Sequence, residues 1–302
     1  MDIQHVHSVH QVAAMKSGAP GDAPGRKPLS VPVQTRKVKT PMGSATVQGQ
    51  LWGARAQQWA AHGEQIGLPL FGAVLDAAHV SYGTRMLDAG CGAGLTALLA
   101  SLRGAQVTCL DASAPLLAIA RERLPDADIY EGDLEALPFP DASFDAVAAV
   151  NSLFYASDIS AAASELARVA CPGARVVATA WGASEFLSTV FPALGPLMPP
   201  TPPGATPPKP GALSEPGALA RLLEEAGLRV VDEGTVASPI VFPNHEISWR
   251  AHSSAGPNQV AIGHSGEDAV EAIYAAADQA HTRPDGTIRY ENEFLWVAGV
   301  RP

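Results

Sequence analysis

The sequence contains few of the residues and patterns typical of secreted, membrane and metal-binding proteins. Only three cysteines occur, Cys91, Cys109 and Cys171, and their spacing fits neither a disulfide framework nor a metal site. No apolar run approaches the ~20 residues of a membrane helix, and the N-terminal residues lack the apolar core of a signal peptide. We therefore expect a cytoplasmic protein with no metal and no membrane span.

Basic residues are also scarce. The chain has 20 Lys and Arg against 30 Asp and Glu, which gives a net charge of −10. Residues 1–49 hold six of the basic residues and only two acidic ones, so the acidic excess lies in the rest of the chain. This acidic body argues against nucleic acid as a partner and suits a cationic ligand.

The N-terminal part of the chain changes character near residue 50. Residues 1–48 are rich in Gly, Pro, Ser and Val without helical or strand periodicity, which predicts a disordered tail. One or two helices are predicted from Gln50 to about Ala78. Within them Trp52 and Trp59 are seven residues apart and share a helical face, either as core aromatics or as a lid over a ligand.

Residues 49–302 are predicted to form a single domain. Strand and helix patterns alternate regularly, which is typical of a doubly wound α/β sheet. The predicted strands cover 84–88, 106–111, 128–131, 144–151 and 175–181, and the predicted helices cover 94–102, 113–124 and 157–170. Ligands of such sheets bind beyond the carboxyl ends of the strands. The polar residues at these ends are Asp88, Asp111, Asp133 and Asn151.

A proline-rich segment follows the alternating region. Residues 192–216 carry ten prolines and are predicted as a surface loop, because proline fits neither a helix interior nor a central strand. A helix capped by Ser214 is predicted over 216–226, and a further strand over 228–233.

The C-terminal part contains an insertion before the final strand. Residues 238–286 include an amphipathic helix from about Glu267 to Ala280, and a terminal strand is predicted over 289–300. An insertion at this place can cap the ligand edge of the sheet.

A glycine-rich turn follows the first predicted strand. Gly90, Gly92 and Gly94 allow the backbone to turn sharply and to approach a ligand at a helix N-terminus. A dinucleotide fingerprint requires glycine where Leu95 stands, and Asp88 would repel a pyrophosphate. The turn therefore favours a cationic nucleoside such as S-adenosylmethionine (SAM) over NAD.

Asp111 ends the strand predicted over 106–111, 23 residues after Asp88. A carboxylate there can accept hydrogen bonds from both ribose hydroxyls of a nucleoside. It can instead cap the following helix, a role that Ser113 could fill equally well. Both interpretations remain open at this point.

Four motifs in order resemble those of the class I SAM-dependent methyltransferases, in particular the ubiquinone/menaquinone-biosynthesis type. They are D-x-G-x-G-x-G at Asp88–Gly94, an acid at Asp111, G-D-x-x-x-L-P-F-x-D-x-S-F-D at Gly132–Asp145 and E-x-x-R-V-x-x-P-G at Glu165–Gly173. The resemblance covers about residues 50–235 and, more loosely, the terminal strand. It implies a Rossmann-like methyltransferase fold, with a mostly parallel seven-stranded sheet and an antiparallel terminal strand.

The resemblance also implies roles for individual residues toward SAM. The glycines of the turn would pass under its methionine part, Asp88 would help to bind its ammonium, and Asp111 would bind the ribose. Asp133 and the Leu134 backbone would meet the adenine. The cofactor-binding residues implied are Asp88, Gly90, Cys91, Gly92, Gly94, Asp111, Ala112, Asp133, Leu134 and Asn151.

The resemblance implies methyl transfer from SAM to a small organic acceptor. In-line displacement at a sulfonium depends mainly on alignment, and a general base is needed only for a weakly nucleophilic acceptor. Candidate bases are Tyr155, after the strand predicted over 144–151, and His245, Glu246 and His252 in the insertion. An ordinary packing or surface role is the more common alternative for each of them.

The acceptor class is narrowed by what is absent. The Asp/Asn-Pro-Pro-Tyr/Phe motif that holds base or amide amino groups does not follow the strand predicted over 144–151, and no basic groove is indicated. The aromatic residues Phe242, Trp249 and Tyr274 of the insertion favour a largely apolar acceptor, such as a secondary metabolite or quinone precursor. One alternative is a protein that binds SAM without methyl transfer, and another is an NAD-dependent oxidoreductase, which Asp88 and Leu95 disfavour.

Overall fold

The structure is a computed structural model, and it describes residues 43–200 and 211–302. All of these residues belong to one compact unit, Thr40–Pro302. Of the tail predicted over 1–48, residues 1–42 lie outside the described part of the chain. Residues 201–210 of the proline-rich segment also lie outside it. The first helix, α1 (Ala45–Gly53), begins four residues before the expected start of the domain at residue 49.

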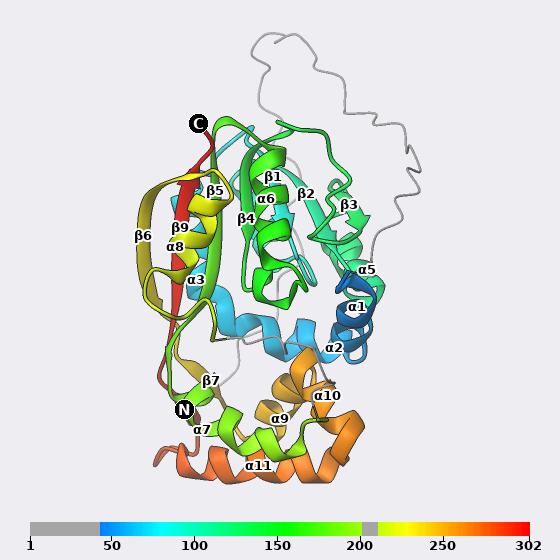
Figure 1. The fold of residues 1–302 in the computed structure, drawn as a ribbon. Coiled ribbons are helices and arrows are strands. Elements are labelled where there is room, and N and C mark those ends of the chain that lie inside the picture. The colour runs from blue at the N-terminus through cyan, green and yellow to red at the C-terminus, as the bar shows by residue number, and fades with distance from the viewer. Residues whose placement is uncertain (1–42, 201–210) are drawn as a thin grey trace, which may run out of the picture. The chain divides into compact units, whose positions relative to one another are not determined.

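A seven-stranded sheet forms the centre of the domain, and it confirms the predicted fold class (Figure 1). Its order is β3-β2-β1-β4-β5-β9-β6, with five parallel strands from β3 to β5 and β9 antiparallel to both neighbours. The strands are β1 (Arg85–Ala89), β2 (Gln106–Asp111), β3 (Asp128–Glu131), β4 (Phe144–Ala149), β5 (Ala170–Ser184), β6 (Arg229–Ala237) and β9 (Asn292–Val300). The order reverses between β1 and β4, where ligands bind in sheets of this kind.

Helices cover both faces of the sheet, so its central strands are apolar on both sides. Met86 of β1 packs into the cluster under α3 (Leu68–Ala77) and α4 (Leu95–Leu102), whereas Leu87 packs into the cluster under α6 (Ile159–Val169) and α8 (Ala218–Glu225). Helix α5 (Ala114–Arg123) follows β2. The two buried clusters together hold the strand ends in place.

The predicted elements differ from the observed ones mainly at their boundaries. Strand β5 begins at Ala170, earlier than the 175 that was expected, and extends to Ser184. The prediction that Ser214 caps the next helix was wrong, since α8 begins at Ala218 with Gly217 as its N-cap. Gly217 adopts φ +72°, a left-handed conformation that glycine accepts easily, while the Ser214 hydroxyl is buried without a hydrogen-bond partner among the described residues.

The single terminal strand predicted over 289–300 is two strands. Residues Ile288–Tyr290 form β8, which pairs with β7 (Ile240–Phe242) in a separate two-stranded sheet, and β9 starts at Asn292. Between them, the backbone N–H of Glu291 donates to Glu185 Oε2 (2.8 Å) and its carbonyl accepts from the N–H of Glu185 (2.9 Å). The first residue of α7 thus satisfies both backbone hydrogen-bonding groups of the residue that separates β8 from β9.

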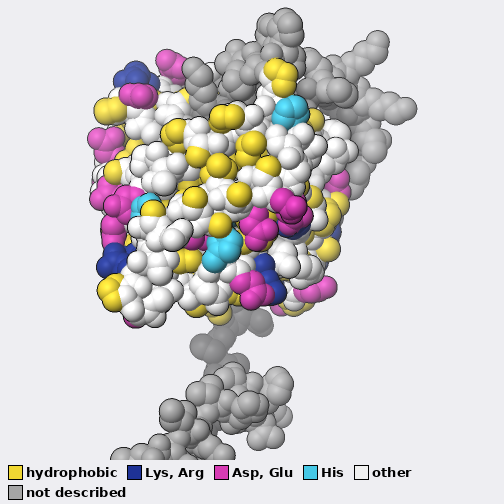
Figure 2. All heavy atoms as spheres, turned by 90° about the horizontal axis from the view of Figure 1, so that it is seen from below, with side chains coloured by type: hydrophobic (Ala, Val, Ile, Leu, Met, Phe, Trp, Pro, Cys, Tyr) yellow, Lys and Arg dark blue, Asp and Glu magenta, His cyan; other side chains and the backbone are white. Residues whose placement is uncertain are grey.

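The chain from residue 185 to 290 contributes a cap with its own apolar core, below the sheet in Figure 1. Its helices are α7 (Glu185–Leu194), η4 (Gly195–Leu197), α9 (His245–Ser253), α10 (Gly256–Ser265) and α11 (Glu267–Ala280). The boundaries of α11 are those predicted. The face of the molecule seen from below carries hydrophobic, acidic and basic side chains (Figure 2). The prediction of a loop over 192–216 was wrong for residues 192–197, which end α7 and form η4. Near the helix end Pro192 removes a single hydrogen bond, while Phe186, Val190 and Leu194 are buried.

The N-terminal helices are more broken than expected. Instead of one or two helices up to Ala78, α1 is followed by α2 (Ala56–Gln58), the π-helix η1 (Trp59–Gly63), the 3-10 helix η2 (Glu64–Gly67) and α3. The first break occurs at Arg55, which adopts φ −133° and ψ 44°. Trp52 and Trp59 are therefore not on one continuous helix, yet their rings meet edge to face at 4.7 Å.

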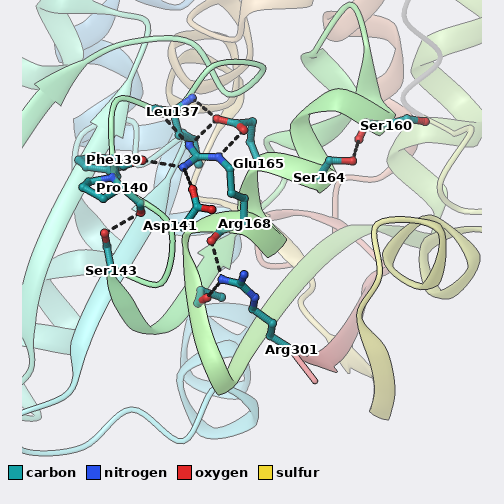
Figure 3. Close-up of polar contacts among 11 residues, drawn as sticks. Leu137, Phe139, Pro140, Asp141, Ser143, Ser160, Ser164, Glu165, Arg168 and Arg301 are labelled. Atoms are coloured by element: carbon teal, nitrogen blue, oxygen red, sulfur yellow. Dashed lines mark hydrogen bonds and ion pairs between the residues drawn. The ribbon is translucent and has the colours of Figure 1, made fainter. Parts of the chain in front are cut away.

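The segment of the third motif that follows residue 136 is attached to α6 through Arg168 (Figure 3). The Arg168 guanidinium donates to both oxygens of Glu165 (2.6 and 2.8 Å) and to the carbonyls of Leu137 (3.1 Å) and Phe139 (2.8 Å). It also pairs with Asp141 at 2.8 Å. This part of the motif holds a loop against a helix and makes no contribution to the cavity described below.

We expect Arg168→Lys to lower the free energy of unfolding by about 1–2 kcal/mol, because an ammonium cannot reproduce the planar fork of hydrogen bonds. Urea denaturation measures this change. The matched control is Arg221→Lys on the exposed side of α8, where we expect a change within about 0.5 kcal/mol. A loss of ligand binding by folded Arg168→Lys protein would contradict the purely structural role.

All three cysteines are free thiols. In the described part of the chain, no helix is both long and apolar enough to cross a membrane. Nor do the described His, Cys, Asp and Glu side chains form a group of three that could hold a metal ion.

Candidate active site

A deep cavity opens at the carboxyl ends of β1, β2 and β4 and extends under the cap. It encloses about 1620 Å³ of space between atoms, including its open mouth. Nine of the ten predicted cofactor-binding residues line it: Asp88, Gly90, Cys91, Gly92, Asp111, Ala112, Asp133, Leu134 and Asn151. Tyr155 also lines it, whereas Gly94 and His245 do not.

The glycine turn forms one wall of the cavity. Gly90 has φ +80°, and a Cβ added there would lie 2.4 Å from the Cβ of Ser152. Ser152 is itself buried, with its hydroxyl donating to the Ala89 carbonyl (2.8 Å). The turn after β1 and the turn after β4 are therefore packed directly against each other, and no residue larger than glycine fits between them.

Gly92 and Gly94 have different roles. Gly92 has φ +56°, and a Cβ there would come within 3.7 Å only of Trp59 Nε1, so this glycine leaves the backbone open toward the cavity. Gly94 is the N-cap of α4 with φ +83°, and it packs against Ala120 and Leu124. Gly94 thus packs against α5, and its contact with the cofactor stays a prediction.

Asp88 is the most unusual group in the cavity. Its side chain is only 1% exposed, and its Oδ2 has no hydrogen-bond partner within the described residues. Burial, reinforced by the nearby Asp111, raises the pKa of Asp88 to about 7. A hydrogen bond from the backbone N–H of Ala97 lowers this pKa by a smaller amount. An unpaired buried carboxylate is costly, so this site favours a cation.

Asp111 is held by the backbone on both sides. Its Oδ2 accepts from the Gly92 N–H (2.8 Å) and its Oδ1 accepts from the Ser113 N–H (2.8 Å). The helix cap is Ser113, whose hydroxyl accepts from the Leu116 N–H (3.4 Å), and not Asp111. Burial raises the pKa of Asp111 as well. These hydrogen bonds fix the orientation of the carboxylate, which lines the cavity.

Cys91, in the same glycine turn, also lines the cavity. A side-chain hydrogen bond with Cys109, followed by burial, raises the pKa of the Cys91 thiol well above its usual range. It is therefore an uncharged thiol at neutral pH and acts as a small apolar side chain in the floor of the cavity.

Asp133 lines the cavity just after the end of β3. Its Oδ1 accepts from the Glu135 N–H (3.0 Å), which fixes the turn that presents Leu134. Glu135 in turn accepts from the Ser44 hydroxyl (3.0 Å) and the Ser157 N–H (2.7 Å). The turn is thereby connected to the start of α1 and to the segment before α6.

Asn151 and Tyr155 follow β4. Asn151 has φ +51°, and this conformation is held by Thr179, which accepts from the Asn151 N–H (2.8 Å) and donates to Asn151 Oδ1 (2.9 Å). Tyr155 belongs to the 3-10 helix η3 (Leu153–Tyr155) and packs edge to face on Trp52 at 5.3 Å. Burial raises the pKa of Tyr155 far above the neutral range, which makes it a poor general base.

The N-terminal helices close the cavity from the side. Trp52 and Trp59 both line it, which favours the interpretation as a lid. Trp52 also touches the cap, because a Cβ added to Gly256 would lie 2.7 Å from its Nε1. Nearby, Arg55 pairs with Glu267 at 2.6 Å. The lid and the cap therefore form a continuous wall.

The cap closes the far end of the cavity with aromatic side chains. His252 of α9 lines it and is 4% exposed, whereas His245 is turned away and binds the buried Asp278 through Nδ1 (2.7 Å). Glu246 is outside the lining and pairs with Arg250. Four further aromatic residues of the lining were not predicted from the sequence, namely Trp181, Phe186, Phe191 and Phe294. Only Trp181 could have been predicted, because it is the last residue of a predicted strand.

Residues 87–178 match a family described as "Methyltransferase domain". The chain contains a class I SAM-dependent methyltransferase domain. Its cofactor is SAM, in agreement with the resemblance of the four motifs. The matched residues begin in β1 and end in β5, so they include the glycine turn and the strand ends that carry Asp111, Asp133 and Asn151.

Two curated relatives share part of this domain. A malonyl-(acyl-carrier protein) O-methyltransferase from Erwinia billingiae is 46% identical over 96 residues, which is 32% of this chain and 38% of the relative. An uncharacterized protein from Mycobacterium tuberculosis is 31% identical over 165 residues, which is 53% of this chain and 60% of the relative. The chain thus spans less than two thirds of the length of either relative.

A solved structure shares the fold of the methyltransferase domain and its surroundings. The (4+2)-cyclase SpnF superposes with a TM-score of 0.56 and 20% identity, over 86% of this chain and 97% of that chain. At this level of identity the match concerns the fold alone.

Proposed function

We propose that this protein transfers a methyl group from SAM to a small, largely apolar organic acceptor. The observation that carries the proposal is the buried, unpartnered Oδ2 of Asp88 beside the glycine turn. An ammonium is the ligand group that best satisfies such a carboxylate. A phosphate-bearing dinucleotide would place negative charge against Asp88 and Asp111, so the NAD alternative is disfavoured.

The other lining residues supply a consistent set of contacts for SAM. In the proposed complex, Asp111 accepts hydrogen bonds from the ribose hydroxyls, and Asp133 with the Leu134 backbone binds the adenine. Gly92 leaves the backbone open above them. When bound, SAM supplies a methyl group on an activated sulfonium. The protein's own task is to align the acceptor and to exclude water, which can account for ~7–11 kcal/mol of the barrier.

The acceptor is proposed to bind in the cap half of the cavity. Its lining there is mostly aromatic, as expected for an apolar molecule. The malonyl acceptor named for the Erwinia relative carries a carboxylate, and no Lys or Arg occurs among the described lining residues to pair with one. We therefore do not extend that acceptor to this chain.

Calorimetric titration with S-adenosylhomocysteine tests the cofactor site. We expect micromolar binding by the wild type and a loss of tenfold or more in Asp111→Ala, about 1.4 kcal/mol, because the ribose acceptors are removed. Glu246→Ala, which removes a carboxylate outside the cavity, serves as the matched control and should bind as the wild type does. The absence of both heat and thermal shift in the wild type would contradict the proposal.

In the second candidate function, the protein binds SAM without transferring its methyl group, or it catalyses a different reaction in the same pocket. The observation that favours it is the structural match to a protein described as a cyclase. Incubation with methyl-labelled SAM and a panel of apolar acceptors separates the two, since only a methyltransferase moves the label into product.

A further inference from the structure

The cavity has two halves that are covered by different parts of the chain. The cofactor half lies at the ends of β1, β2 and β4, and the N-terminal helices cover it with Trp52 and Trp59. The other half is a chamber under the cap, lined in part by the start of α10 through Ala255, Pro257 and Asn258. The cofactor half thus has the lid as its cover, and the chamber has the cap.

Trp59 connects the lid to the glycine turn. A Cβ added to Gly92 would lie 3.7 Å from Trp59 Nε1, and no other described atom outside the turn comes within 4 Å of it. The same indole ring meets Trp52 edge to face at 4.7 Å. In the proposed complex, a cofactor that passes over Gly92 therefore packs against Trp59, and Trp59 packs against Trp52.

Trp52 is held between the lid, the turn after β4 and the cap. It meets Tyr155 of η3 edge to face at 5.3 Å, in addition to Trp59. Helices α1 and α10 lie side by side (Figure 1). A Cβ added to the buried Gly256 of α10 would lie 2.7 Å from Trp52 Nε1 and 2.9 Å from Cδ1 and Cε2. No residue larger than glycine fits there unless Trp52 moves.

The part of α10 that contacts Trp52 also supports the chamber. Gly256 is the first residue of α10, and Asn258 follows two residues later. The Tyr274 hydroxyl of α11 donates to Asn258 Oδ1 (3.0 Å), and Asn258 Nδ2 donates to the His252 carbonyl of α9 (2.6 Å). A displacement of α10 at Gly256 is therefore transmitted to the chamber wall on α9, α10 and α11.

A second contact between lid and cap is the ion pair of Arg55 and Glu267. Their side chains are 28% and 42% exposed, and an ion pair with this much access to water contributes little. The indole of Trp52 has close apolar contacts on several sides and cannot be replaced by water. The contact of Trp52 with Gly256 is therefore the stronger connection between the two covers.

We propose that Trp52 is a positioning residue that couples the two halves of the cavity, so that cofactor binding stabilises the closed chamber under the cap. This inference rests on the proposed function. The two states of the coupled element differ in whether Trp52 is packed on Gly256. The bound cofactor favours the packed state through Trp59. Because such coupling is reciprocal, cofactor and acceptor each raise the affinity of the protein for the other by the same factor.

A matched pair of substitutions in α10 tests the coupling. We expect Gly256→Ala to weaken the binding of S-adenosylhomocysteine about tenfold or more, because the new methyl group displaces Trp52, although Gly256 does not line the cavity. The control is Gly263→Ala on the exposed side of the same helix, where an added Cβ meets nothing within 4 Å. Its affinity should stay within about twofold of the wild type. Equal affinities of the two folded variants would overturn the inference.

A double-mutant cycle shows whether Gly256→Ala acts through Trp52. We expect Trp52→Ala alone to bind S-adenosylhomocysteine about tenfold more weakly than the wild type, since the lid loses its contact with the cap. In this background, Gly256→Ala should change the affinity by less than about twofold, because the displaced ring is gone. General damage to the cap would instead weaken binding by the same factor in both backgrounds, and that result would contradict the role of Trp52.

Hydrogen exchange measures the coupling in the wild type. Saturation with S-adenosylhomocysteine should slow the amide exchange of Gly256–Ser265 by about fivefold or more, and Trp52→Ala should show no such slowing. Unchanged exchange of α10 in wild-type protein that binds the ligand would overturn the coupling. Failure of the wild type to bind S-adenosylhomocysteine would instead reject the cofactor proposal. If Gly256→Ala fails to fold, the exchange of α10 in the wild type decides.

Discussion

Replacing Gly90 by alanine is expected to lower the free energy of unfolding by about 2–5 kcal/mol and to abolish cofactor binding. The residue has φ +80°, which costs a residue with a Cβ about 1–2 kcal/mol. The new Cβ would also lie 2.4 Å from the Ser152 Cβ, so the turns after β1 and β4 must move apart. Overpacking of this kind adds about 1–3 kcal/mol. Urea denaturation and calorimetry measure the two effects.

Gly92→Ala is the matched control. Gly92 also has a positive φ, +56°, but the nearest atom to an added Cβ is Trp59 Nε1 at 3.7 Å. We expect a loss of only about 1–2 kcal/mol, from backbone strain alone. Ser152→Gly in the Gly90→Ala background should recover part of the lost stability, because it removes the atom that clashes. Equal losses for Gly90→Ala and Gly92→Ala would contradict the steric explanation.

The affinity for S-adenosylhomocysteine is expected to rise about tenfold between pH 6 and pH 8. The pKa of Asp88 is raised to about 7, so the carboxylate is mostly protonated at pH 6 and mostly ionised at pH 8. Only the ionised form attracts the ligand's ammonium, which stays protonated over this range. Calorimetric titrations at half-unit intervals would follow the change.

Asp88→Asn provides the comparison for this pH dependence. At pH 8 we expect the variant to bind at least thirtyfold more weakly, about 2 kcal/mol, and its affinity should be nearly constant with pH. Without ligand, the wild type should lose stability as pH rises from about 4 to 7, because the folded state retains a proton that the unfolded chain releases near the ordinary pKa of 3.8. The variant should lack this loss. A flat affinity profile in the wild type would contradict the role of Asp88.

Much of the sheet and of the cofactor half of the site could be predicted from the sequence. The strands at Gln106–Asp111 and Asp128–Glu131 have the predicted boundaries because short apolar runs there end at turn residues. Asp88 was recognised by its place at a strand end before a glycine turn. These features depend on local patterns, so one sequence is sufficient to detect them.

The cap half could not be predicted in the same way. Its chamber is built from β5, β9, α7, α9 and α11, and no local pattern reveals that Trp181, Phe186 and Phe294 share a wall. His245 and His252 are both on α9, yet only the structure shows that His245 binds Asp278 and that His252 lines the cavity. Similarly, the change of sheet at Glu291 depends on Glu185, which is distant in sequence.

The position of β9 between β5 and β6 has a consequence for biosynthesis. Residues 292–300 emerge from the ribosome after both neighbouring strands, so the nascent chain holds a sheet with two unpaired edges until they are made. The wall of the cavity is completed equally late, because Phe294, which lines it, belongs to β9. Premature termination before β9 would therefore release a chain that is both unable to enclose its ligands and prone to aggregation.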